Sequence, residues 1–132
     1  MAPILPSFQH QPGFNEIDPQ SAAASLKAFR VVDVREPGEF VGPLGHIEEA
    51  QSIPLTHLPA VVEGWPPTES LLVVCRSGAR SARACEYLKL RGFGAVYNLR
   101  GGMLGWEAAG LPVVRQAGPA AVRGAGYGST VG

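Results

Sequence analysis

The sequence has little charge and no excess of either sign. Its 132 residues include 11 Lys and Arg against 11 Asp and Glu, so the formal net charge is zero, and only 17% of residues are charged. Proteins that bind nucleic acid usually carry a basic patch or stripe, and the sequence has no basic stripe. The composition therefore gives nucleic-acid binding no electrostatic support.

The sequence also lacks long apolar runs. The longest extend over only a few residues, whereas a membrane-spanning helix needs about 20, so we expect no membrane contact. The first residues show no basic stretch followed by an apolar one, and a secretory signal is not expected. Internal repeats are absent as well, and a chain of this length predicts one domain, with a monomer as the expected state.

Cysteine and histidine are scarce. The two cysteines, Cys75 and Cys85, and the scattered His10, His46 and His57 match no metal-ligand spacing, so we expect no metal and no other cofactor. A disulfide between the cysteines needs Cα atoms within ~7 Å, which a loop and a helix between them disfavour. Free thiols persist in reducing compartments, and a cytoplasmic location is therefore expected.

One apolar segment runs directly into a cysteine, which is followed by a glycine and two arginines. In order, the residues are Leu71, Leu72, Val73, Val74, Cys75, Arg76, Ser77, Gly78, Ala79, Arg80 and Ser81. Backbone N–H groups in a tight turn form a concave anion site, and the start of a helix adds the positive end of its dipole. Nearby cations lower a thiol pKa from about 8.5 by several units. Because the thiolate is the nucleophile, we predict covalent chemistry at Cys75. The alternative is a buried, inert cysteine, which is common in protein cores.

Five segments together resemble the rhodanese family of sulfurtransferases. They are, in chain order, VDVREPGEF (32–40), GHIEEA (45–50), SIPL (52–55), CRSGARS (75–81) and NLRGGMLGW (98–106). The resemblance extends from about residue 16 to residue 113. It implies that Cys75 takes a sulfane sulfur from thiosulfate or a persulfide donor, holds it as a persulfide, and passes it to cyanide, a thiol or a protein acceptor.

The resemblance also assigns roles around the sulfur. The side chains of Arg76 and Arg80 would orient the oxyanion of the donor. The backbone N–H groups that would hold the terminal sulfur belong to Arg76, Ser77, Gly78, Ala79 and Arg80. Arg35, at the end of a strand, has two interpretations: part of the substrate mouth, or an ion-pair cluster with Asp33 or Glu36 that braces the loop. We favour the ion pair.

Two other functions use the same features. Cysteine-dependent phosphatases and arsenate-reductase-like enzymes also close a cysteine loop with an arginine, but with five intervening residues in place of the four here. A single sulfur atom fits a smaller loop than a tetrahedral oxyanion does, so sulfur transfer is favoured. A non-catalytic rhodanese-like binding module is the third interpretation, and the intact Cys75, Arg76 and Arg80 disfavour it.

Strand and helix signals alternate along the chain. Strands are expected at 14–17, 31–34, 52–53, 71–74 and 95–99, and helices at 18–29, 58–63, 79–90 and 103–109. Alternation of this kind predicts an α/β fold, a single rhodanese-like domain whose central, mostly parallel sheet has helices on both faces. We assign 13–114 to the domain, 1–12 to a flexible segment and 115–132 to a flexible Gly/Ala-rich tail.

Several further residues have structural interpretations. His46, in the Gly-His-Ile motif, is expected to be a hydrogen-bonded structural histidine, and Cys85 to lie on the buried face of its helix. Met103 and Trp106 are expected to pack the last helix onto the sheet. Residues 41–44 look like an insertion relative to many family members. We expect them to lengthen a surface loop, which would alter acceptor choice if it reached the pocket.

Overall fold

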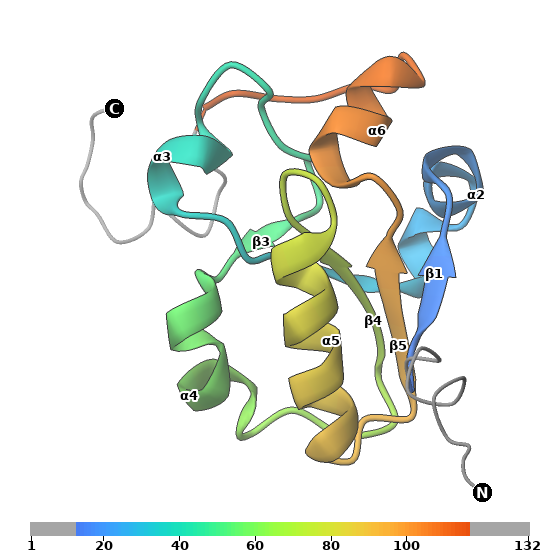
Figure 1. Ribbon diagram of the computed structural model, residues 1–132, viewed down its shortest axis with the longest axis vertical. Helices are drawn as coiled ribbons and strands as arrows, with labels where there is room; N and C mark the ends of the chain where they lie inside the picture. Colours follow the sequence, from blue (N-terminus) through green and yellow to red (C-terminus); the bar gives the residue numbers. More distant parts are fainter. Residues whose placement is uncertain (1–12, 117–132) are drawn as a thin grey trace, which may run out of the picture.

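The protein is built on one five-stranded parallel sheet with helices on both faces (Figure 1). The computed structural model describes residues 13–116. The strands, in the spatial order β1-β5-β4-β2-β3, are Asn15–Ile17 (β1), Arg30–Asp33 (β2), Gln51–Ser52 (β3), Ser70–Val74 (β4) and Ala95–Leu99 (β5). The predicted α/β class is therefore confirmed. The expected flexible segment 1–12 lies outside the described residues, and so does the expected tail, 115–132, apart from its first two residues.

Two helices cover each face of the sheet. The helices are Pro19–Ala24 (α2), Pro37–Phe40 (α3), Leu58–Val62 (α4), Ala79–Leu90 (α5) and Gly102–Ala108 (α6), with short 3-10 turns at Leu26–Ala28 (η1) and Leu55–His57 (η2). Leu71 and Val73 of β4 pack toward α4 and α5, whereas Leu72 and Val74 pack toward α2 and α6. Successive side chains of a strand point to opposite faces, which explains why the central strand is apolar throughout. None of the helices within 13–116 is long and apolar enough to cross a bilayer.

The predicted helix over 18–29 is shorter than expected. It begins as predicted, because Asp18 caps it by accepting from the Ser21 N–H at 3.0 Å. It ends at Ala24, however, and the chain continues as the 3-10 turn η1. Ser25 Oγ donates to the Ser21 carbonyl at 2.9 Å. A serine that bonds its own backbone in this way competes with the regular helix, which accounts for the early end.

The short helix α3 was not predicted from the sequence. Pro37 occupies its first turn, and the Glu39 carboxylate accepts from the Glu36 N–H at 2.9 Å. Proline at the first position and a glutamate three residues after the cap are ordinary helix-start signals. The signal was therefore present in the sequence, in a segment too short to show helical periodicity.

His46 is a buried structural histidine, as predicted. Its Nδ1 donates to the Phe40 carbonyl at 2.6 Å, and its ring stacks on that of Phe40 with centroids 3.5 Å apart. Its backbone exchanges two hydrogen bonds with Val114, at 2.8 and 2.9 Å. The buried Nε2 has no hydrogen-bond partner among the described residues. Burial lowers the pKa of His46, so the ring is neutral in the folded protein.

This neutral ring makes stability depend on pH. The unfolded chain binds a proton at His46 below about pH 6.5, whereas the folded chain binds it only at lower pH. The contribution of His46 to stability is therefore complete above the unfolded pKa and declines as pH falls toward the lowered folded pKa. In His46→Asn, the side-chain amide nitrogen takes the place of Nδ1, two bonds from Cβ, and can donate to the Phe40 carbonyl without titrating. We expect the urea midpoint to fall less between about pH 7.5 and about pH 5.5 in this variant than in the wild type. An equal fall in both proteins would contradict the account.

Candidate active site

Cys75 lies at the carboxyl end of the central strand, where three strands end side by side. It follows Val74, the last residue of β4, and the strand registers place Val74 beside Asp33 of β2 and Val73 beside Asn98 of β5. The loop then turns at Gly78, whose φ of 109° is left-handed, and α5 begins at Ala79. Glycine adopts such a φ at little cost. This edge of an open parallel sheet is where ligands of such folds bind.

The Cys75 sulfur receives hydrogen bonds from the loop and from α5. The Gly78 N–H donates to Sγ at 3.0 Å, and the Ser81 hydroxyl lies 3.2 Å from it. Burial by itself raises the pKa of the Cys75 thiol. Hydrogen bonds from the Ser81 side chain and from the backbone N–H groups of Ser81, Gly78 and Ser77 outweigh burial, so the pKa lies below its ordinary value. The largest stabilising contributions to the thiolate are thus hydrogen bonds. The backbone N–H groups were expected among them, and the Ser81 hydroxyl was not.

Ser81 and Asn98 form a buried pair that the sequence analysis did not single out. The single proton of the Ser81 hydroxyl has two acceptors, Asn98 Oδ1 at 2.5 Å and Cys75 Sγ at 3.2 Å. The side chains of Ser81 and Asn98 are both buried. Asn98 Nδ2 donates to the Gly78 carbonyl at 3.2 Å and to the Glu16 carboxylate at 3.1 Å. Asn98 therefore ties the cysteine loop to β5 and β1 and fixes the hydroxyl beside the sulfur. A polar residue inside the apolar strand β5 was the sequence signal that pointed to this role.

The start of α6 holds the outer side of the cysteine loop. The Met103 N–H donates to the Cys75 carbonyl at 2.9 Å, and the Leu104 N–H donates to the Arg76 carbonyl at 3.0 Å. A helix leaves its first N–H groups without partners inside the helix, and here the loop carbonyls accept from two of them. Gly102 allows this approach, because a Cβ there would lie 2.5 Å from both carbonyl oxygens.

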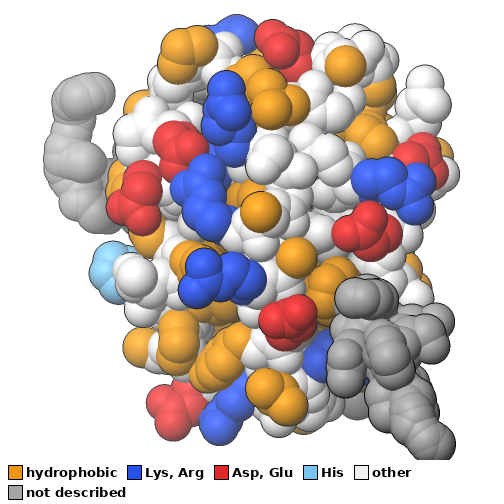
Figure 2. Space-filling model, viewed as in Figure 1, with side chains coloured by type: hydrophobic (Ala, Val, Ile, Leu, Met, Phe, Trp, Pro, Cys, Tyr) orange, Lys and Arg blue, Asp and Glu red, His pale blue; other side chains and the backbone are white. Residues whose placement is uncertain are grey.

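The two arginines of the loop differ in their partners. Arg80 forms a two-pronged ion pair with Glu39 of α3, with N–O distances of 2.8 and 2.9 Å. Hydrogen bonding from Arg80 lowers the pKa of Glu39 to about 2. Arg76 is exposed, and its guanidinium makes no hydrogen bond or ion pair with any residue of the described part of the chain. Figure 2 shows Lys and Arg side chains in a column over the face that carries α5, with acidic side chains beside it.

Arg35 is buried and ion-paired with Asp33, which agrees with the interpretation that the sequence analysis favoured. Its Nε and Nη2 donate to the two Asp33 oxygens at 2.8 and 2.7 Å, and Nη2 also donates to the Gly45 carbonyl at 2.8 Å. Nη1 donates to the Glu39 carbonyl at 3.2 Å. Arg35 therefore holds α3 and the loop that follows it against the end of β2.

A hollow of about 200 Å³ lies beside the cysteine loop. Its walls are formed by Arg35, Glu39, Pro43, Leu44 and Arg76. Two residues of the 41–44 insertion thus reach this hollow, a point that the sequence left open. Inside the described range, no group of three or more His, Cys, Asp or Glu side chains is arranged to hold a metal ion.

Cys85 takes no part in the site. It lies fully buried on the inner face of α5, as predicted, and both cysteines are free thiols. Burial raises the pKa of Cys85, so its thiol stays protonated and unreactive. Trp106 and Met103 are buried in the core, as predicted.

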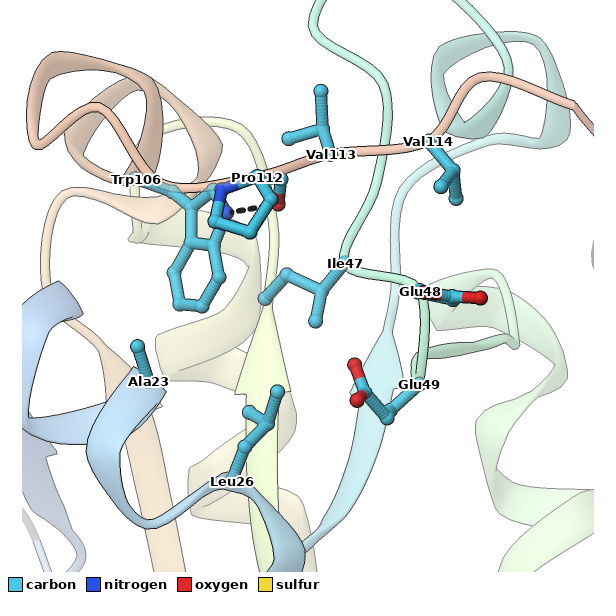
Figure 3. A pocket seen from close by; sticks show the side chains of 9 residues that line it. All are labelled: Ala23, Leu26, Ile47, Glu48, Glu49, Trp106, Pro112, Val113 and Val114. Atoms are coloured by element: carbon cyan, nitrogen blue, oxygen red, sulfur yellow. Dashed lines mark hydrogen bonds between the residues drawn. The ribbon is translucent and has the colours of Figure 1, made fainter.

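A second hollow, of about 180 Å³, lies between α2 and α6 (Figure 3). Its lining is apolar apart from two carboxylates and consists of Ala23, Leu26, Ile47, Glu48, Glu49, Trp106, Pro112, Val113 and Val114. It shares no residue with the hollow beside the cysteine loop and contains no nucleophilic side chain.

Comparison with known proteins gives one consistent family. Residues 18–109 match the family described as "Rhodanese-like domain". A "Sulfurtransferase" of Allochromatium vinosum is 40% identical over 103 residues, which are 76% of this chain and 94% of that protein. A "Thiosulfate sulfurtransferase GlpE" of Vibrio cholerae is 32% identical over 102 residues, with the same coverage. The crystal structure of a rhodanese-related protein from Thermoplasma volcanium superposes with a TM-score of 0.71 at 32% identity, covering 78% of this chain and all of that one.

The hydrogen bond from Ser81 can be tested by alkylation. Ser81→Ala removes the hydroxyl beside Sγ, so we expect the pKa of Cys75 to rise and its reaction with iodoacetamide to begin at higher pH. Ser70→Ala, at the opposite end of β4, is the matched control and should leave the profile unchanged. The measurement is the alkylation rate as a function of pH. A Ser81→Ala profile that coincides with that of the wild type would refute the assigned contribution.

The approach of α6 can be tested at Gly102. Gly102 and Gly110 both have left-handed φ, 59° and 73°, but a Cβ at Gly110 would meet no atom within 4 Å. Gly110→Ala should cost about 1–2 kcal/mol of unfolding free energy, from the backbone conformation alone. Gly102→Ala should cost about 3 kcal/mol or more, because the loop carbonyls must also move. Denaturant unfolding measures both, and equal costs would contradict the close approach.

Proposed function

The chain belongs to the rhodanese-like family of sulfurtransferases, and we propose that it carries sulfane sulfur on Cys75 from thiosulfate or a persulfide donor to a thiophilic acceptor. The observation that carries this proposal is the set of hydrogen bonds directed at Sγ, from the Gly78 N–H at 3.0 Å and from Ser81 Oγ at 3.2 Å. They favour the thiolate, which is the form of cysteine that attacks sulfur.

The transfer has two steps. The Cys75 thiolate attacks the sulfane sulfur of thiosulfate; a new S–S bond forms, the bond to the sulfonate sulfur breaks, and sulfite leaves with the electron pair. The acceptor then attacks the outer sulfur of the persulfide, and Cys75 leaves as a thiolate. With cyanide as acceptor, the product is thiocyanate. The two displacements need no external oxidant or reductant, and they should give ping-pong kinetics.

The low pKa of Cys75 serves both steps. The thiolate is the attacking group in the first and the leaving group in the second, and a thiol of lower pKa leaves faster. We assign the backbone N–H groups of residues 76–80 to the outer sulfur, since those of Ser77 and Gly78 already stabilise the sulfur of Cys75. Arg76, exposed beside the hollow, is assigned to the anionic group of the donor.

The partners follow from this chemistry. We propose a small-molecule or protein-bound sulfur donor, and cyanide, a thiol or a protein sulfur acceptor. A working persulfide cysteine requires a reducing setting, so we place the protein in the cytoplasm. Phosphate-ester and arsenate chemistry is disfavoured, because four residues separate Cys75 from Arg80 and a small loop suits a single sulfur atom.

Mass spectrometry of the intact protein tests the proposal. After incubation with thiosulfate or with a small-molecule persulfide, the wild type should gain the mass of one sulfur atom and lose it again on addition of cyanide. Cys75→Ser should gain none. Cys85→Ala is the control with one thiol fewer, and should behave like the wild type because Cys85 is buried. A folded, reduced wild type that gains sulfur from neither donor would overturn the proposal, as would a gain by Cys75→Ser.

A further inference from the structure

Glu39 places a negative charge at the mouth of the cysteine loop. Its carboxylate binds Arg80, the residue that closes the loop, through both guanidinium Nη atoms. The same carboxylate forms part of the wall of the hollow that also contains Arg76. Glu39 comes from α3, far from the cysteine loop in the sequence, and α3 stands beside the loop in space (Figure 1).

The carboxylate is fixed in this position. Glu39 Oε1 also accepts from the Glu36 N–H at 2.9 Å, which caps α3, and the Glu39 carbonyl accepts from the buried Arg35 at 3.2 Å. The pKa of Glu39 is lowered to about 2, chiefly by hydrogen bonding from Arg80. Glu39 therefore stays ionised at any pH where the thiolate can react.

Of the two guanidinium groups that line the hollow beside the loop, one has no counter-charge within residues 13–116. Arg35 is neutralised by Asp33, and Arg80 is neutralised by Glu39. Of the two arginines that line this hollow, only Arg76 lacks an acidic partner among the described residues. Arg115, which is outside the lining, donates its Nε–H to the Pro43 carbonyl at 2.9 Å. A dianionic donor and the Cys75 thiolate together bring three negative charges to a hollow whose lining contains one uncompensated cation, Arg76. A donor with one negative charge meets a smaller repulsion.

We propose that Glu39 is a specificity residue that selects against dianionic donors such as thiosulfate and in favour of sulfane-sulfur donors of lower charge, such as persulfides. The proposal rests on the sulfurtransferase function proposed above. The ion pair with Glu39 weakens the attraction between Arg80 and an anionic sulfur donor. The charge of the sulfur donors that the site accepts therefore depends on α3 as well as on the cysteine loop.

The experiment compares two donors that differ by one charge. Thiosulfate is a dianion and benzenethiosulfonate a monoanion, and both deliver one sulfane sulfur to a thiolate. In Glu39→Gln, an amide replaces the carboxylate and keeps an oxygen that can accept from the Glu36 N–H. We expect kcat/KM for thiosulfate to rise about tenfold and that for benzenethiosulfonate about threefold or less, so that the ratio of the two shifts toward thiosulfate.

Glu49→Gln is the matched control. It removes the same charge from an exposed carboxylate in the other hollow (Figure 3), and it should leave the ratio unchanged. Pro43→Lys is a second test, which does not depend on how well Glu39→Gln folds. It places a cation at an exposed position of the hollow beside the loop and leaves the ion pair intact. It should shift the ratio in the same direction as Glu39→Gln.

The outcomes separate the two proposals. If the wild type takes sulfur from neither donor, the proposed function fails. If the wild type transfers sulfur but the ratio is unchanged in folded Glu39→Gln, or moves toward benzenethiosulfonate, the role of Glu39 is overturned and the sulfurtransferase function stands. An unchanged ratio in Pro43→Lys would likewise overturn the charge argument, and so would a shift of equal size in Glu49→Gln.

Discussion

The site depends on the direction in which the peptide groups of the cysteine loop point. The Gly78 N–H points inward to Sγ, while the carbonyls of Cys75 and Arg76 point outward and accept from the first turn of α6. The Gly78 carbonyl also points away from the sulfur and accepts from Asn98. Because these three carbonyls accept hydrogen bonds elsewhere, the N–H groups of the loop are available to an anion before any sulfur donor binds. Hydrogen-bond donors that are already in position need no reorganisation when negative charge develops on the sulfur.

The number of arginines near Cys75 overstates the positive charge that is available to its thiolate and to a substrate. Three arginines lie near the cysteine in the sequence or in space, yet Arg35 and Arg80 are each bound to a carboxylate. The thiolate is stabilised mainly by neutral donors, namely Ser81 and the loop amides. Among the residues that line the hollow, the positive charge left for a substrate is that of Arg76, and Glu39 of α3 limits how much of the charge of Arg80 is added to it.

The sequence predicted correctly those helices and strands whose signals lie within one continuous segment. The helix at 79–90 and the strand at 95–99 have the predicted bounds, and the apolar run at 71–74 forms most of the central strand. The cysteine loop was found because its residues are consecutive. The Glu39–Arg80 pair and the Ser81–Asn98 pair join residues 41 and 17 positions apart. Such contacts depend on how strands and helices are placed in the tertiary structure, and no spacing rule within one segment reveals them.

The most direct test of this account is a titration of the wild-type thiolate without any sulfur donor. The ultraviolet absorbance of the thiolate, measured against pH and corrected with Cys75→Ser, gives the pKa of Cys75, because the raised pKa of Cys85 keeps that thiol protonated. The account predicts a midpoint below the value of about 8.5 that is typical of a free cysteine. A midpoint at or above that value would mean that burial outweighs the hydrogen bonds, and would contradict the view that the loop is built to hold an anionic sulfur.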